Sequence, residues 1–98
     1  MTVVFAPQAL LDLENLHAYV ARMSRASQAS VTLARIRKSI NRLELFPFSG
    51  RAGSVEGTRE LVVSGLPYRV VYQLVRNQVV IERVLHTSQQ WPPANEPR

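Results

Sequence analysis

The chain has 98 residues, 46% of them hydrophobic, which is enough for one modest core and unlike the composition of a disordered protein. It contains no cysteine, which excludes disulfides and thiolate chemistry. Twelve Lys and Arg against seven Asp and Glu give a formal net charge of +5. Such a surface favours nucleic acid or an acidic protein as partner, unless it is simply the solvated face of a helix.

The N-terminal segment has no basic leader and meets Asp12 and Glu14 early, so it does not resemble a signal peptide. No apolar run approaches the roughly 18 residues needed to cross a bilayer. We therefore expect a cytoplasmic protein without membrane contact. Because the two histidines lie far apart and cysteine is absent, we expect no metal site and no cofactor.

The first half of the chain predicts one short strand and two helices. A strand over residues 3–5 ends before Pro7, which suits the first turn of a helix. Apolar residues at steps of three and four predict that this helix ends near Ser24 and buries one stripe: Leu10, Leu13, Leu16, Val20 and Met23. Cap-forming residues at 24–27 predict the start of a second helix, whose apolar stripe is Leu33, Ile36, Ile40 and Leu43.

The second helix is strongly basic on its outer side. Residues 22–42 carry six cations and no acid. At about 100° per residue, Arg35, Lys38 and Arg42 lie opposite the apolar stripe. Phe46-Pro47 stops the helix. The two helices therefore predict a helical hairpin with one buried face and a basic exterior.

The second half predicts an antiparallel sheet. Residues 47–57 hold three of the four glycines and predict a loop, followed by strands at 58–63, 68–76 and 79–86 with a two-residue turn at Asn77-Gln78. Tyr68, Tyr72 and their alternate neighbours should face the helices. The fold class is α+β, in the order β-α-α-β-β-β, with the hairpin on one face of a mainly antiparallel sheet. We expect one domain over residues 1–92 and a disordered, proline-rich tail over residues 93–98.

Three segments carry a resemblance to a known family: PFSGRAGSVEGTREL at 47–61, PYRVVY at 67–72 and VLHTSQQWP at 84–92. In this order they resemble toxins of the RelE/ParE superfamily, which belong to type II toxin–antitoxin systems. RelE-like members are ribosome-dependent endonucleases that cut mRNA. ParE-like members inhibit DNA gyrase. The resemblance implies a cognate antitoxin whose C-terminal part wraps the toxin.

The RelE-like alternative depends on two candidate catalytic residues. Metal-free RNA cleavage needs a proton acceptor, a cation for the charged transition state and a proton donor. Arg69 matches the family arginine that contacts the scissile phosphate, and His86 is a candidate general base. The family's second arginine falls near Gln89, whose neutral amide makes no charge-assisted contact. The alternative for His86 is a structural histidine at a strand end that hydrogen-bonds to the backbone.

The remaining features favour the ParE-like branch, in which the important surface contacts a target protein. The candidate target-binding residues are Arg59, Arg83 and Trp91. An alternative for Arg59 is a cross-strand ion pair with an acid such as Glu82. A third possible function, a DNA-binding module explained by charge alone, lacks any helix-turn-helix or zinc pattern.

The predicted antitoxin partner should present an acidic C-terminal segment to this basic chain. An exposed apolar edge at Leu11 and Tyr19 should anchor a partner helix. The basic helix face should contact the acidic residues through Arg35, Lys38 and Arg42.

Overall fold

The computed structural model describes residues 1–93. Its elements in chain order are β1 (Thr2–Phe5), α1 (Pro7–Met23), α2 (Ala26–Asn41), the 3-10 turn η1 (Arg42–Glu44), β2 (Arg51–Ala52), β3 (Thr58–Val62), β4 (Tyr68–Val75) and β5 (Gln78–His86). The predicted order is confirmed, with one addition. The sequence predicts a loop over residues 47–57, whereas the structure contains the two-residue strand β2 within this range.

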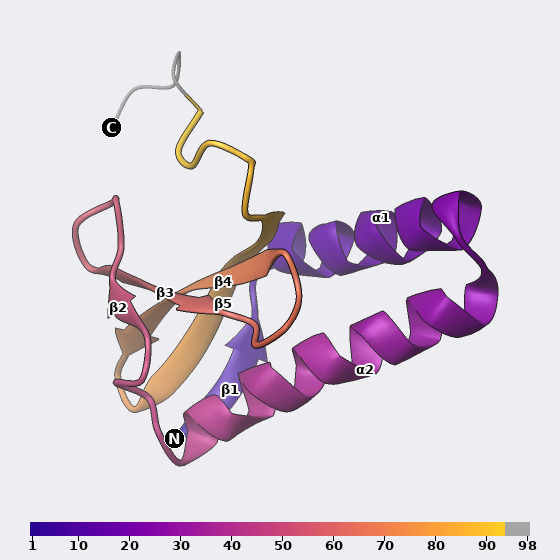
Figure 1. Cartoon of the computed structure of the whole chain (residues 1–98). Helices are drawn as coiled ribbons and strands as arrows, with labels where there is room; N and C mark the ends of the chain where they lie inside the picture. The colour runs from indigo at the N-terminus through magenta and orange to yellow at the C-terminus, as the bar shows by residue number, and fades with distance from the viewer. Residues whose placement is uncertain (94–98) are drawn as a thin grey trace.

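The five strands form one sheet in the order β1-β5-β4-β3-β2. β1 runs parallel to β5, and the other neighbouring pairs are antiparallel. The α1–α2 hairpin lies on one side of this sheet, and its far end projects beyond the strands (Figure 1). This arrangement confirms the predicted α+β class and the mainly antiparallel sheet.

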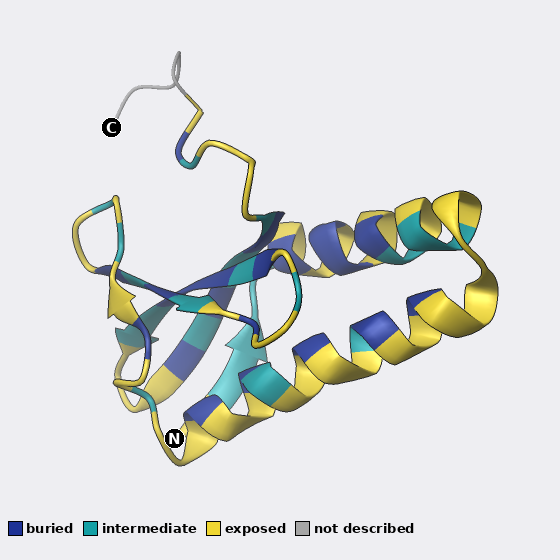
Figure 2. Ribbon diagram, in the orientation of Figure 1, coloured by how far each residue is buried: buried dark blue, intermediate teal, exposed yellow. Residues whose placement is uncertain are grey.

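The core lies between the hairpin and the sheet. Ile36 and Ile40 of α2 and Leu43 of η1 are fully buried, as are Val70 and Tyr72 of β4. Burial of such side chains contributes about 1.5–3 kcal/mol each. The buried faces of both helices turn toward the sheet, and their outer faces are exposed (Figure 2). The predicted stripe of the second helix is thereby confirmed.

The predicted stripe of the first helix is wrong at both ends. Leu10 is 51% exposed and Met23 is 69% exposed. The face turned to the sheet is centred one residue earlier and contains Ala9, Asp12, Leu13 and Leu16. Met23 lies at the end of the hairpin that projects beyond the sheet, where no strand can cover it (Figure 2).

The turn between the last two strands also differs from the prediction. Val75 pairs with Gln78, so the two-residue turn is Arg76-Asn77 and not Asn77-Gln78. Both turn residues have positive φ, 48° and 66°, as a type I′ hairpin requires. The second helix begins as expected, at Ala26, but without a side-chain hydrogen bond at its cap. The cap residue is Arg25, and the neighbouring serines do not perform this role.

Within residues 1–93, no helix is long and apolar enough to cross a bilayer. In the same range, no three His, Asp or Glu side chains gather in a way that could hold a metal ion. Of the tail expected at 93–98, only Pro93 belongs to the described residues.

Candidate functional site

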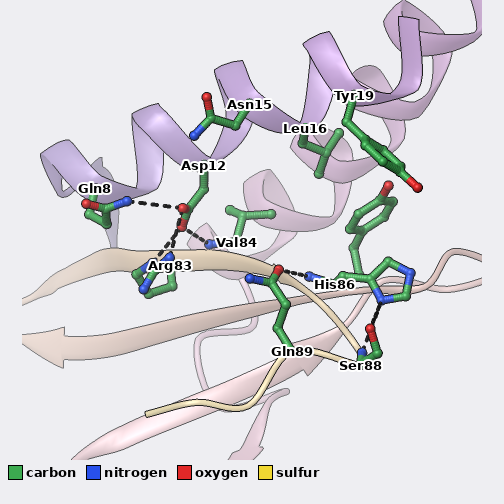
Figure 3. A pocket seen from close by; sticks show the side chains of 11 residues that line it. Gln8, Asp12, Asn15, Leu16, Tyr19, Arg83, Val84, His86, Ser88 and Gln89 are labelled. Atoms are coloured by element: carbon green, nitrogen blue, oxygen red, sulfur yellow. Dashed lines mark hydrogen bonds and ion pairs between the residues drawn. The ribbon is translucent and has the colours of Figure 1, made fainter. Parts of the chain in front are cut away.

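A groove of about 540 Å³ separates α1 from the end of β5 (Figure 3). It exists because β1 pairs with β5 only as far as Ile81. Beyond that point the outer edge of β5 has no strand beside it, and α1 takes the place of one. Side chains from α1, from β5 and from the segment after β5 line the groove.

Asp12 of α1 fixes the helix to this edge. Its carboxylate accepts hydrogen bonds from Arg83 Nε at 2.7 Å and Nη2 at 3.0 Å, and from the backbone N–H of Val84 at 2.9 Å. Gln8 Nε2 donates a further bond at 3.3 Å. The side chain of Asp12 is 8% exposed and that of Arg83 is 21% exposed. A mostly buried carboxylate thus has a full set of donors, as such a group requires.

The ion pair extends to the C-terminal segment. The Arg83 guanidinium lies 5.1 Å from the centre of the Trp91 ring, close enough for a cation–π contact. Two of the three predicted target-binding residues are therefore together, but Arg83 is already engaged on both sides. Sequence analysis missed Asp12. The signal was its position three residues after Ala9 and four before Leu16, on the face that the helix buries.

Arg69 is engaged in a second internal ion pair. Its Nη1 donates to Glu60 Oε1 at 2.7 Å, and its Nη2 donates to the backbone oxygen of Gln89 at 2.6 Å. The exposed fractions of the two charged side chains are 13% and 3%. Glu60 Oε2 also accepts from the backbone N–H of Ser54 at 3.1 Å. Arg69 Nε is buried without a hydrogen-bond partner among the described residues.

The two candidate catalytic residues lie on opposite faces of the sheet. His86 pairs with Tyr68, whereas Arg69 pairs with Leu85, the neighbour of His86 along β5. Because successive side chains of a strand alternate between faces, Arg69 and His86 point apart. The His86 ring packs edge-on against Tyr68 at 5.6 Å. Its Nδ1 accepts a hydrogen bond from the backbone N–H of Ser88 at 3.1 Å.

Gln89 closes the turn that follows β5. Its side-chain Oε1 accepts from the backbone N–H of His86 at 2.8 Å, and its own N–H donates to the His86 oxygen at 2.9 Å. Gln89, near which the resemblance predicts the family's second arginine, therefore holds the turn after β5. Nearby, burial raises the pKa of Tyr68 above its ordinary 10.0, and the Tyr19 hydroxyl adds to the rise. Tyr68 is thus a neutral hydroxyl and unsuited to accept a proton.

Arg59 lies on the other side of β4, away from Arg83 and Trp91. Its Nη1 donates to the Gly50 oxygen at 2.7 Å and to the Phe48 oxygen at 3.4 Å, and its guanidinium lies 4.9 Å from the centre of the Phe48 ring. The ion pair with Glu82 considered above is not formed, because β4 separates β3 from β5. The three predicted target-binding residues thus form two separate groups.

The loop beneath Arg59 is held by a buried tyrosine. The Tyr72 hydroxyl donates to the Pro47 oxygen at 2.8 Å and accepts from the Gly50 N–H at 2.9 Å. A Cβ on Gly50 would lie 2.6 Å from that hydroxyl, so only glycine permits this approach.

The residues predicted to bind an antitoxin are exposed but divided. Leu11 and Tyr19, 49% and 51% exposed, lie on α1, and Tyr19 lines the groove beside β5. Arg35, Lys38 and Arg42 are exposed on the α2 side. There Arg35 donates to the Ser64 oxygen at 2.9 Å and so lies against the end of β3.

The fold and this arrangement of strands are shared with solved toxins. The chain superimposes with a TM-score of 0.82 on a chain of the chromosomal ParDE TA system from P. aeruginosa, at 18% identity over 88% of this chain and 95% of that one. For the intact E. coli RelBE toxin–antitoxin complex the TM-score is 0.61, at 16% identity over 90% and 98% of the two chains. The protein therefore has the RelE/ParE fold.

The sequence defines the family within that fold. The model of the ParE toxin of the type II toxin–antitoxin system parDE matches residues 3–91. The chain is also 39% identical over 85 residues to "Putative toxin Y4kP" of Sinorhizobium fredii (strain NBRC 101917 / NGR234), covering 87% of this chain and 86% of that one. The protein belongs to the ParE toxin family and is a type II toxin–antitoxin toxin.

Proposed function

We propose that this toxin inhibits DNA gyrase by protein–protein contact and is neutralised by a cognate antitoxin. The observation that carries the proposal is the position of Arg69. Its guanidinium bonds to Glu60 and to the Gln89 oxygen, so it has little capacity left for a phosphate. His86 lies on the other face of the sheet, so its side chain points away from the face that carries Arg69.

The competing activity is ribosome-dependent cleavage of mRNA. It requires a cation at the scissile phosphate together with a proton acceptor on the same side. On the face that carries Arg69, the neighbouring carboxylate of Glu60 already balances the charge of the arginine. The arrangement favours a structural role for Arg69 and leaves the gyrase proposal as the better supported one.

The antitoxin is proposed to bind across the hairpin. The exposed Leu11 and Tyr19 offer apolar contacts, and Arg35, Lys38 and Arg42 offer charge. Because these groups lie on different helices, we expect the antitoxin to bind as an extended acidic segment that crosses from α1 to α2. We favour this segment as partner instead of a single bulky helix.

A cleavage assay with purified gyrase tests the main proposal. The wild-type toxin should trap gyrase–DNA cleavage complexes or block supercoiling. A double variant, Arg69→Met with Glu60→Gln, should do so equally well, because it removes both charges and keeps an acceptor for the Ser54 N–H. If gyrase is unaffected and the double variant loses mRNA cleavage that the wild type performs on ribosomes, the proposal is wrong.

A further inference from the structure

An exposed apolar surface lies on the far side of β4 from the groove, where η1 leads toward β2. Phe46 is 54% exposed, Phe48 65%, and Leu45, just before them, 78%. Val62 of β3 is 52% exposed and lines the same pocket of about 380 Å³ as Phe46. We call these four residues the Phe46–Phe48 surface. Large exposed apolar side chains that line one pocket, as Phe46 and Val62 do, usually mark a contact site.

Two arginines border this surface, each beside an aromatic ring. The guanidinium of Arg42 lies 6.0 Å from the centre of the Phe46 ring, and that of Arg59 lies 4.9 Å from the Phe48 ring. Arginine and aromatic side chains are the residues that contribute most to protein–protein contacts. Their combination distinguishes this surface from the isolated exposed apolar residues Met23 and Val31 on the hairpin.

The Phe48–Arg59 pair is held in place before any partner binds. The Gly50 and Phe48 oxygens fix the guanidinium, and the buried Tyr72 hydroxyl fixes the loop through Pro47 and Gly50. A rigid contact residue loses less conformational entropy on binding than a mobile one. The loop therefore already has a fixed conformation before a partner binds.

The charges indicate the chemistry of the partner. Within residues 1–93, the ion pairs of the structure are those of Arg69 with Glu60 and Arg83 with Asp12. Arg42 and Arg59 therefore have no carboxylate partner in the described part of the chain. A partner segment with carboxylates beside an apolar side chain would complement these two arginines and the pocket that Arg42 and Phe46 line.

We propose that the Phe46–Phe48 surface, with Arg42 and Arg59, is the site that contacts the target protein, binding an acidic segment with an apolar anchor. An antitoxin that engages Arg42 would cover part of this site. A protein is favoured over nucleic acid because a guanidinium lies over each phenyl ring, where a base would otherwise stack, and because the pocket is bordered by Leu61 and Val62. The identity of that target as gyrase rests on the proposed function.

The test compares two sets of substitutions in the full chain. The surface variant carries Phe46→Ser and Phe48→Ser, with Arg42→Glu added in a second version. The matched control carries Met23→Ser and Val31→Ser, with Arg22→Glu added, because these residues are also exposed but lie on the hairpin. Thermal unfolding verifies that all variants fold. Binding to purified gyrase holoenzyme, binding to a short single-stranded RNA, and growth arrest on induction are then measured.

The surface variant should bind gyrase at least about 30-fold more weakly than wild type and lose growth arrest, as expected for loss of central contact residues. The control should stay within about twofold for gyrase binding. Unchanged gyrase binding and growth arrest in the surface variant overturn the inference and leave the proposed function intact. Selective loss of RNA binding overturns it too. If the wild-type toxin does not bind gyrase, and the surface variant loses growth arrest while the control keeps it, the gyrase proposal is wrong. The proposal that this surface contacts the target then still holds.

Discussion

Four arginines of this toxin lie in two contrasting regions. Arg69 and Arg83 lie inside ion pairs with Glu60 and Asp12, beside the C-terminal segment. Arg42 is exposed and Arg59 is half-buried; each lies beside an exposed phenyl ring and has no carboxylate partner within the described residues. The first pair joins elements of the fold, and the second is the pair that we propose contacts a partner. Net positive charge alone does not distinguish these roles; the contacts of each guanidinium do.

The largest expected effect on stability follows from Asp12→Ala. The change leaves Arg83 unpaired while 21% exposed and removes the acceptor of the Val84 N–H. Breaking a buried ion pair from one side costs about 3–5 kcal/mol, and the partial exposure of Arg83 places the expected loss near 3 kcal/mol. Urea unfolding measures it. The control Glu14→Ala, exposed on the same helix, should change stability by less than about 0.5 kcal/mol. Equal losses in both variants contradict this role of Asp12.

Tyr72→Phe tests the loop that carries the Phe46–Phe48 surface. It removes both bonds of a buried hydroxyl and leaves the Gly50 N–H and the Pro47 oxygen without that partner. We expect a loss of about 2 kcal/mol in the free energy of unfolding, together with weaker target binding. Tyr19→Phe is the matched control, because Tyr19 is 51% exposed. A Tyr72→Phe protein as stable as wild type would show that the loop does not depend on this hydroxyl.

A smaller effect distinguishes a structural Arg69 from a catalytic one. Arg69→Met alone should destabilise the fold, because it leaves Glu60 charged and 3% exposed. Adding Glu60→Gln should restore most of the loss, to within about 1 kcal/mol of wild type, since a neutral pair needs no counter-charge. Thermal unfolding of both variants measures this rescue. If the double variant is instead less stable than Arg69→Met alone, Arg69 and Glu60 do not stabilise each other as an ion pair.

The smallest expected effect is on the stability of the fold at alkaline pH. Burial raises the pKa of Tyr68, so above about pH 10 the unfolded chain loses this proton while the folded chain keeps it. The folded state then binds more protons than the unfolded state, and stability falls as pH rises through that range. Tyr68→Phe should lessen the fall between about pH 8 and pH 11, measured as the shift of the urea midpoint. An equal fall in both proteins contradicts the assignment.

Much of the fold could be predicted because the sequence patterns are local. Two sets of residues lie in the core as their patterns predict. One follows the helical spacing of Ile36, Ile40 and Leu43, and the other follows the strand alternation of Tyr68, Val70 and Tyr72. The predictions were wrong where tertiary contacts determine which face is buried or which strand forms. Leu10 fits a helical stripe, but the sheet contacts the neighbouring face of α1. The strand β2 is two residues long and depends on its pairing with β3.

The candidate site was predicted less well, because its contacts join residues far apart in the chain. Asp12 and Arg83 are separated by 71 residues, and no local pattern relates them. Arg69 and His86 were grouped by the chemistry of their side chains, but strand register places them on opposite faces. Arg59 was placed correctly on a strand, yet its partners Phe48 and Gly50 come from a loop whose shape only the buried Tyr72 explains.

The central claim is that this toxin acts on DNA gyrase and not on mRNA. Pulse-labelling of DNA and protein synthesis within minutes of inducing the chain alone in bacteria tests it most directly. We predict an early fall in DNA synthesis with DNA-damage signalling, while protein synthesis continues at first. An early fall in protein synthesis with unaffected DNA synthesis would contradict the account and return Arg69 and His86 to consideration as catalytic residues.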